Sequence, residues 1–150
     1  MKAVKLLILL FIPLLLACTR QDDISMNPNT DEVKDGIFVH ISKGPADVHE
    51  VMMGLMIANK FSDTHDVILF FDIDGIGMVL GDAPDLTLEP FGSSDKLFEK
   101  LTEKGIKIMA CPACLTTAGK TAADLRPGVI VAEKDLFFSF TKGRILTLDY

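Results

Sequence analysis

Short apolar runs alternate along this chain with longer segments in which apolar residues recur at every third or fourth position. A run of about four to eight apolar residues between turn-forming residues predicts a buried strand, whereas the longer spacing predicts a helix with one buried face. The predicted strands are 36–42, 65–72, 106–110, 129–131 and 144–148. The predicted helices are 45–60, 76–80, 94–104, 113–123 (interrupted near Gly119) and 133–140.

This alternation predicts an α/β domain with a mostly parallel sheet of about five strands and helices on both faces. A single domain fits the length of 150 residues, and a hydrophobic content of 49% can supply its core. Ligands of such sheets bind beyond the carboxyl ends of the strands. Ser42, Asp72 and Cys111 all lie at the ends of predicted strands, so we expect the candidate site at this edge.

The N-terminus has the three parts of a secretory signal peptide. Two lysines precede an apolar run at 6–16, which is too short to span a membrane, and Ala17 is a small residue at the cleavage position. The sequence Leu-Leu-Ala-Cys at 15–18 resembles the bacterial lipobox, whose Cys is acylated and becomes the first mature residue. Cys18 is therefore the predicted lipidation site. The alternative is a plain secretory signal that Cys18 follows by coincidence.

These features divide the chain into a lipoprotein signal peptide at 1–17, a flexible tether at 18–35 and an α/β domain at 36–150. The tether is polar and has no apolar period. An irregular arm packed on the domain is the alternative for this stretch. The predicted location is the cell envelope, with the protein lipid-anchored to a membrane. Because Thr19 rather than Asp follows the Cys, we expect the periplasmic side of the outer membrane in a cell that has two membranes.

Charge narrows the range of partners. After removal of the signal peptide, the chain has 13 basic and 21 acidic residues, which gives a formal charge of −8. A negative protein is repelled by phosphate backbones and by anionic membrane surfaces, so nucleic acid is not a predicted partner. Membrane attachment would come from the lipid. Trp is absent and Tyr150 is the only Tyr, so the chain offers few platforms for stacking on bases.

The candidate chemistry is the Cys-Pro-Ala-Cys sequence of Cys111 and Cys114. Pro112 suits the first turn of a helix, so Cys111 is expected just before a helix N-terminus, where free N–H groups and the dipole favour a thiolate. This Cys spacing within a βαβ pattern is typical of redox or metal sites. Alternatively, Cys111 is a small buried apolar residue. Cys114 serves either as a resolving thiol or in packing, and in an oxidising compartment the pair could form a disulfide.

Other motifs are weaker, and neither a cofactor nor a metal is predicted. One Cys pair supplies two of the roughly four ligands that structural zinc uses, although two subunits could contribute a pair each. The glycines at 75–81 are spaced one residue too far apart for the dinucleotide-binding fingerprint. Asp72 and Asp74 could bind a cation, but capping of the helix that follows is favoured.

Residues 36–140 resemble the DsrE/DsrF-like proteins, a family that includes YchN-like and TusD-like members. The segment 101–111 carries the most specific part, a Leu-x-x-x-Gly sequence that leads through a strand to Cys111. The other features are the strand at 37–41 with its following helix, and the strand at 67–71 followed by Asp72 and Gly75. This chain lacks the Arg-Gly that many members carry shortly after the Cys, and the usual setting of the family is cytoplasmic.

The resemblance implies a flavodoxin-like three-layer fold, assembly into trimers or hexamers, and a Cys that carries persulfide sulfur between proteins. By motif position, that residue would be Cys111, and Cys114 would match the second Cys of some members. We therefore expect an exported, lipid-anchored sulfur carrier or thiol-redox protein that works with a sulfur donor or acceptor protein. The alternative is a non-enzymatic, oligomeric binding or assembly module of the same fold.

Overall fold

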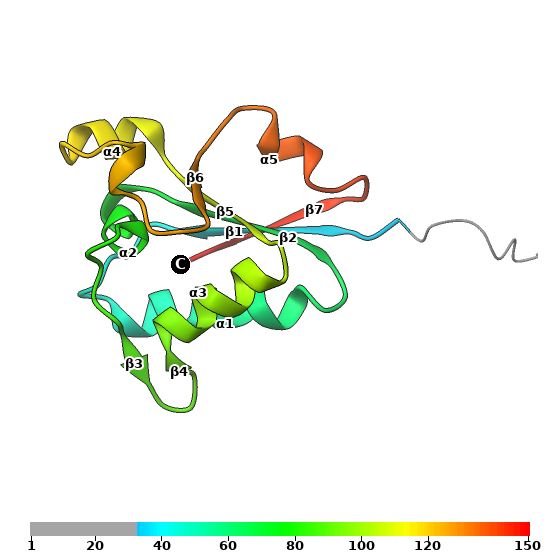
Figure 1. Ribbon diagram of the computed structural model, residues 1–150. Coiled ribbons are helices and arrows are strands. Elements are labelled where there is room, and N and C mark those ends of the chain that lie inside the picture. The colour runs from blue at the N-terminus through cyan, green and yellow to red at the C-terminus, as the bar shows by residue number, and fades with distance from the viewer. Residues whose placement is uncertain (1–32) are drawn as a thin grey trace, which may run out of the picture. The chain divides into compact units, whose positions relative to one another are not determined.

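The computed structural model describes residues 33–150, which form an α/β domain (Figure 1). The predictions for the signal peptide, for Cys18 and for most of the tether fall on residues 1–32, outside the described part of the chain. Of the remaining tether, Lys34 and Asp35 contact the domain: the Lys34 carbonyl accepts a hydrogen bond from Thr141 Oγ1 at 2.7 Å, and the Asp35 carboxylate pairs with Arg144 at 2.6 Å.

The centre of the domain is a five-stranded sheet in which every pair of neighbouring strands is parallel. This confirms the predicted fold class. The strands lie in the order β6-β5-β2-β1-β7, so the C-terminal strand is an edge strand beside the first one. Their bounds are Gly36–Ile41 for β1, Asp66–Phe71 for β2, Lys107–Ala110 for β5, Val129–Val131 for β6 and Ile145–Asp149 for β7.

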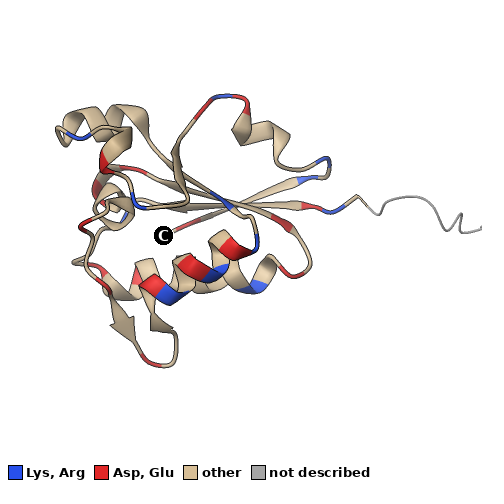
Figure 2. Ribbon diagram, in the orientation of Figure 1, with Lys and Arg blue, Asp and Glu red and all other residues tan. Residues whose placement is uncertain are grey.

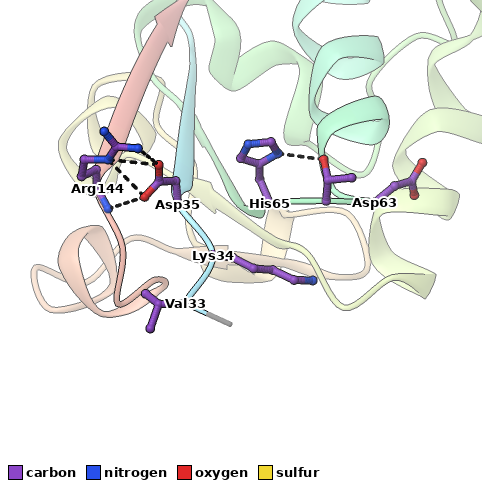
Figure 3. Close-up of a pocket in the computed structure, with 7 residues that line it drawn as sticks. Val33, Lys34, Asp35, Asp63, His65 and Arg144 are labelled. Atoms are coloured by element: carbon purple, nitrogen blue, oxygen red, sulfur yellow. Dashed lines mark hydrogen bonds and ion pairs between the residues drawn. The ribbon is translucent and has the colours of Figure 1, made fainter. Parts of the chain in front are cut away.

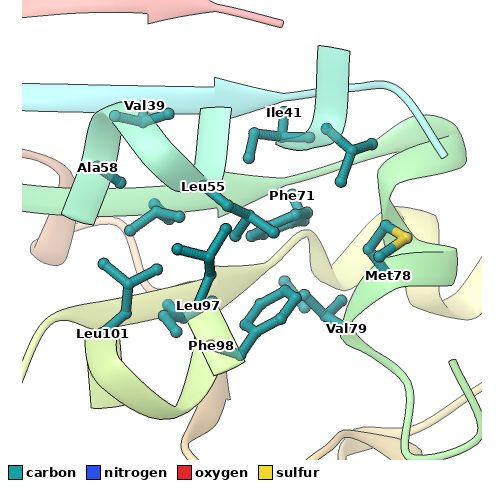
Figure 4. Close-up of a cluster of buried hydrophobic side chains, with 14 of the residues drawn as sticks. Val39, Ile41, Leu55, Ala58, Phe71, Met78, Val79, Leu97, Phe98 and Leu101 are labelled. Carbon is teal, nitrogen blue, oxygen red and sulfur yellow. The ribbon is translucent and has the colours of Figure 1, made fainter. Parts of the chain in front are cut away.

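One face of the sheet is covered by α1 (Val48–Phe61) and α3 (Ser94–Glu103), which lie below it in Figure 1. Their apolar residues recur at helical spacing and meet the inward-facing residues of the strands in a single core (Figure 4). Leu55, Phe71 and Leu101 are completely buried there. Burial of each such side chain contributes about 1.5–3 kcal/mol to the stability of the fold. This core therefore holds in place the sheet that carries the site.

The opposite face, which we call the second face, is covered by α5 (Leu136–Ser139). Phe137 of α5 packs against the strands, with its ring centroid 5.6 Å from that of Phe38 and 5.1 Å, edge to face, from that of Phe70. The predicted helix at 133–140 was too long, and the three residues expected to be buried in it, Leu136, Phe137 and Phe140, are only half-buried. A helix of one turn covers little area, so the second face keeps exposed apolar side chains, among them Phe138.

Several helix ends differ from their predicted positions. The first helix begins at Val48 after the N-cap Asp47, not at Pro45. The segment predicted as a helix at 113–123 is α4 (Pro112–Thr117) followed by a 3-10 turn, η2 (Ala122–Asp124). The helix is interrupted between them at Gly119, whose φ is 67°. That left-handed backbone suits Gly and ends α4 where the sequence suggests a break.

The remaining elements surround the carboxyl ends of the strands. A 3-10 turn, η1 (Ile73–Gly75), leads directly into α2 (Ile76–Val79) after β2. A small hairpin of β3 (Thr87–Leu88) and β4 (Gly92–Ser93) precedes α3, in a stretch where no strand was predicted. Within residues 33–150, no helix combines the length and apolarity needed to cross a membrane.

Candidate functional site

Cys111 lies at the carboxyl edge of the sheet, as predicted. Strand β5 ends at Ala110, and the N–H of Cys111 still donates to the carbonyl of Phe71 on β2, at 2.9 Å. Cys111 is the N-cap of α4, with Pro112 in the first helical position. Its Sγ accepts the N–H of Cys114 at 3.4 Å, which is a capping contact made by sulfur. The sulfur of Cys111 is therefore held at the start of α4.

Cys114 lies one turn further along α4 and faces back toward the end of β2. Its Sγ accepts the N–H of Ile73 at 3.3 Å. Both cysteines are free thiols and half-buried. The hydrogen bond with the Cys111 thiol raises the pKa of Cys114, and burial and the negative charge of Asp72 act in the same direction, while the Ile73 N–H opposes them in part. These contacts favour the protonated form of Cys114.

Asp72 is the first residue after β2, and its N–H donates to the carbonyl of Ile41 at 3.3 Å. The prediction that its side chain caps the following helix was wrong, because the carboxylate faces His40 on the neighbouring strand: Oδ1 lies 2.9 Å from His40 Nε2. This contact is an ion pair when His40 is protonated. Among the residues that the structure describes, neither of these two buried atoms has a hydrogen-bond partner.

His40 is held from its other side as well. Its Nδ1 lies 2.8 Å from Oδ1 of Asp149, the last residue of β7. Burial of the ring lowers the pKa of His40, but the contacts with Asp149 and Asp72 outweigh burial and hold the pKa above its ordinary value. Three neighbouring strands therefore contribute one Asp–His–Asp chain, which ends beside the cysteines. Figure 2 shows acidic positions around α2 at this edge.

Ile73 joins this chain to the cysteines and was not recognised from the sequence. Its φ is 47°, in the left-handed region that a β-branched residue rarely adopts, and its side chain is 65% exposed. This backbone turns the Ile73 N–H toward Cys114. Two signals could have indicated the site more fully. His40 is a polar residue in an apolar run, and Asp149 lies at the end of the last strand.

Gly75 has a packing role at this edge of the sheet. Gly75 donates its N–H to the carbonyl of Ser42, and a Cβ on Gly75 would collide with the carbonyl oxygen of Ile41. Close approach of η1 to the end of β1 therefore requires a Gly here, independently of any nucleotide. Within residues 33–150, no group of three or more His, Cys, Asp or Glu side chains is arranged to hold a metal ion.

A shallow hollow lies at the opposite, amino-terminal edge of the sheet (Figure 3). It is lined by residues that precede the strands, including Asp35, His65 and Arg144. The hydrogen bond from Arg144 lowers the pKa of Asp35. This ion pair, with 2.6 Å between Arg144 Nη2 and Asp35 Oδ2, lines one side of the hollow. The hollow contains no cysteine among its lining residues, so the candidate site remains the edge with Cys111.

Comparison with known proteins identifies the family. Residues 35–138, more than half of the chain, match the model of the DsrE/DsrF-like family. The chain belongs to this family. The match spans the sheet from β1 to β6 and includes both cysteines, so the resemblance recognised in the sequence is confirmed over most of the described DsrE-like domain.

Two solved structures share the fold. One is a protein of unknown function, MTH1491, from Methanobacterium thermoautotrophicum, with a TM-score of 0.53 and 15% sequence identity. The other is the ychN protein from E. coli, with a TM-score of 0.51 and 18% identity. Each alignment covers 77% of this chain and 99% of the other. No curated protein matches this chain. These similarities support the DsrE-like fold, and the chemistry must be argued from the site.

Proposed function

We propose that this DsrE-like protein is a sulfur carrier or thiol-redox protein that uses Cys111 as its nucleophile and Cys114 as its second thiol. The observation that carries the proposal is the asymmetry of the pair. The sulfur of Cys111 accepts an N–H at the start of α4, whereas the raised pKa of Cys114 keeps that thiol protonated. Membership of a family associated with sulfur relay supports the same assignment.

The chemistry needs only these two sulfurs and a donor. The Cys111 thiolate attacks the outer sulfur of a donor persulfide, forms Cys111–S–SH, and releases the donor as its thiolate. An acceptor thiolate can then take the outer sulfur. Alternatively, Cys114 attacks the Cys111 sulfur, which forms the Cys111–Cys114 disulfide and releases hydrosulfide. The half-buried position of both thiols suits a reaction with a partner protein that docks at this edge.

The proposal includes export and a lipid anchor. The Leu-Leu-Ala-Cys sequence at 15–18 supports acylation of Cys18 after cleavage of residues 1–17. The protein would then act in the cell envelope, attached through the lipid to a membrane, at its outer-membrane periplasmic side in a diderm cell. The sulfur donor or acceptor would have to be present in that compartment.

A second candidate is an oligomeric binding or assembly module, and the second face supports it. Phe138 is 73% exposed there, and Ile130 and Ile145 are 42% and 41% exposed. Strand register puts both isoleucines on the same side of the sheet as Phe38. Exposed apolar groups on one face favour association of copies. We therefore propose a homo-oligomer, a trimer or hexamer, whether or not the cysteines react.

Intact mass after exposure to inorganic polysulfide tests the sulfur chemistry. The full chain carrying Cys18→Ser, kept in mild detergent, should gain the mass of added sulfur. Cys111→Ser in that background should abolish the gain. Cys114→Ser, the matched control, should keep the loaded form, because the thiol that releases sulfur is missing. If there is no mass gain, and both cysteines are alkylated equally and only at alkaline pH, the binding module becomes the better assignment.

A further inference from the structure

The Asp–His–Asp chain of the carboxyl edge is linked to Cys114 through the backbone of Ile73. Asp72 contacts His40 through its side chain, and the peptide that follows Asp72 donates the Ile73 N–H to Cys114 Sγ. The raised pKa of Cys114 is caused mainly by the Cys111 thiol and by burial, and the negative charge of Asp72 makes a smaller contribution in the same direction. Asp72 therefore immediately precedes the residue whose N–H contacts the second thiol.

The second thiol has a proton to lose before it can react. Only the thiolate attacks a sulfur–sulfur bond, so resolution by Cys114 requires a proton acceptor within reach, directly or through one water. The charged groups that face Cys114 and His40 are few. Cys114 is faced by Cys111 and by Asp72, and His40 is faced by Asp72 from the end of β2 and by Asp149 from β7.

We propose that Asp72 accepts the proton of Cys114 during resolution, and that His40, held by Asp149, positions the Asp72 carboxylate for this transfer. This inference rests on the proposed function.

In the step, the Cys114 sulfur forms a bond with Cys111 Sγ while the bond from Cys111 Sγ to the transferred group breaks. That group leaves with the bonding electrons as a thiolate or hydrosulfide. The Cys114 proton moves to Asp72 and from there to solvent or to the leaving group. The two thiols are oxidised to one disulfide, and the incoming persulfide or disulfide is reduced.

Geometry gives each group a separate task. The Asp72 carboxylate has one oxygen against His40 Nε2, at 2.9 Å, and its side chain is 19% exposed, so its position is defined. The ring of His40 is fixed at Nδ1 by Asp149, at 2.8 Å. The Phe70 ring lies beside it, with 5.7 Å between ring centroids. Loss of His40 would leave the Asp72 carboxylate without this contact and free to rotate.

An aromatic disulfide, dithionitrobenzoate, separates the two steps because each releases a coloured thiolate. The full chain with Cys18→Ser, in mild detergent, should release a first equivalent when Cys111 attacks and a second when Cys114 resolves the mixed disulfide. Asp72→Asn should leave the first phase unchanged and slow the second by about a hundredfold, the low end of what a positioned proton-transfer group contributes. His40→Gln should slow the second phase less. Asp74→Asn, an exposed carboxylate in the same turn, is the matched control and should change neither phase.

The pH profile of the second phase distinguishes proton transfer from a merely structural role. With Asp72 replaced, the rate should follow the thiolate fraction and rise about tenfold per pH unit below the pKa of Cys114. The parent protein should show a flatter profile. A second phase that is unchanged or faster in Asp72→Asn would overturn the inference, because removal of a purely electrostatic carboxylate lowers the pKa of Cys114 and speeds its attack. Absence of the first phase in the parent protein would reject the proposed function and this inference with it.

Discussion

The imidazole of His40 faces the carboxylate of Asp72 across the boundary between β1 and β2, with 2.9 Å between Nε2 and Oδ1. Since Nδ1 of the same ring lies 2.8 Å from Asp149 Oδ1, both ring nitrogens face carboxylates. Only the imidazolium form has an N–H at both positions. Protonated His40 therefore links the ends of three neighbouring strands, and the protonation state of one side chain bears on both stability and chemistry.

This relationship predicts a pH dependence of folding. Burial lowers the pKa of His40 and the contacts with Asp149 and Asp72 raise it, with a net increase over the unfolded value of about 6.5. A raised folded-state pKa means that the contribution to the free energy of unfolding is complete below the unfolded pKa. It is lost as the pH rises through the folded-state pKa. Urea unfolding under reducing conditions should therefore show that the parent protein exceeds His40→Gln in stability most clearly near pH 6. The difference should be smaller at mildly alkaline pH, and a constant difference would contradict the assigned pKa shift.

The strained backbone of Ile73 predicts a stabilising substitution. A φ of 47° costs a non-glycine residue about 1–2 kcal/mol, and Gly adopts it freely, although Gly loses more conformational entropy on folding. The Ile73 side chain is 65% exposed, so little burial is lost. Ile73→Gly should raise the free energy of unfolding by up to about 1 kcal/mol. Ile73→Ala keeps the strain and should give no gain. A stability loss in Ile73→Gly would show that the exposed side chain has a partner.

A third prediction concerns Arg126, which connects the segment after η2 to α3. Its Nη2 lies 2.5 Å from Asp95 Oδ1, its Nη1 donates to the Met78 carbonyl at 3.3 Å, and its guanidinium carbon lies 4.1 Å from the centroid of Phe98. Arg126→Ala should lower the free energy of unfolding by about 2 kcal/mol, measured by urea unfolding. Arg126→Lys should recover less than half, because an ammonium cannot make these planar contacts together. Lys96→Ala, on the exposed side of α3, should have little effect.

The spacing of apolar residues and the turn-forming residues between them predicted the main strands and helices well, because each spacing is typical of one kind of element. The run of apolar residues before Cys111, with Gly105 before it and Pro112 after it, allowed only a short strand between two helices. The sequence offered Ser93 or Ser94 as the cap of the helix that follows, and Ser93 is the N-cap of α3, with its Oγ accepting the Lys96 N–H at 3.3 Å. The second face was harder, since Phe137 looked like part of a long buried helix.

The Asp–His–Asp chain could not be predicted in the same way. His40 and Asp149 are 109 positions apart, and their contact depends on β7 joining the sheet beside β1. Hydrophobic spacing indicates that a strand is present but does not give the order of strands. Asp72 was noticed as a strand-end carboxylate, but its partner could be recognised only once that order was known.

Lipidation of Cys18 is tested separately from the chemistry of the domain. Acylation at this residue predicts that the parent protein enters the membrane fraction of the producing cell and carries acyl mass on its first mature residue. Cys18→Ser should lose the acyl group and leave the membrane fraction after export. Cys114→Ser, which removes another thiol, should behave as the parent does. Unchanged membrane partition of Cys18→Ser, together with no acyl mass on the parent protein, would argue against a lipoprotein.

The final prediction concerns assembly through the second face. Phe138 is 73% exposed on α5, above a strand surface that a single turn of helix cannot cover. If copies associate there, Phe138→Glu would bury an unpaired carboxylate in an apolar interface, at a cost larger than most interfaces tolerate. Sedimentation velocity at micromolar concentration should then show a smaller species than the parent protein, with unchanged far-ultraviolet circular dichroism.

The matched control for Phe138→Glu is Leu146→Glu. Leu146 is 57% exposed on β7, and its register with Ile37 puts it on the side of the sheet that α1 and α3 cover. Leu146→Glu should leave the oligomer intact because its charge stays outside the proposed interface. Equal dissociation by both substitutions would argue against the second face as the contact surface. A monomeric parent protein at the same concentration would reject the oligomer, because the exposed Phe138 would then have no copy of this chain to cover it.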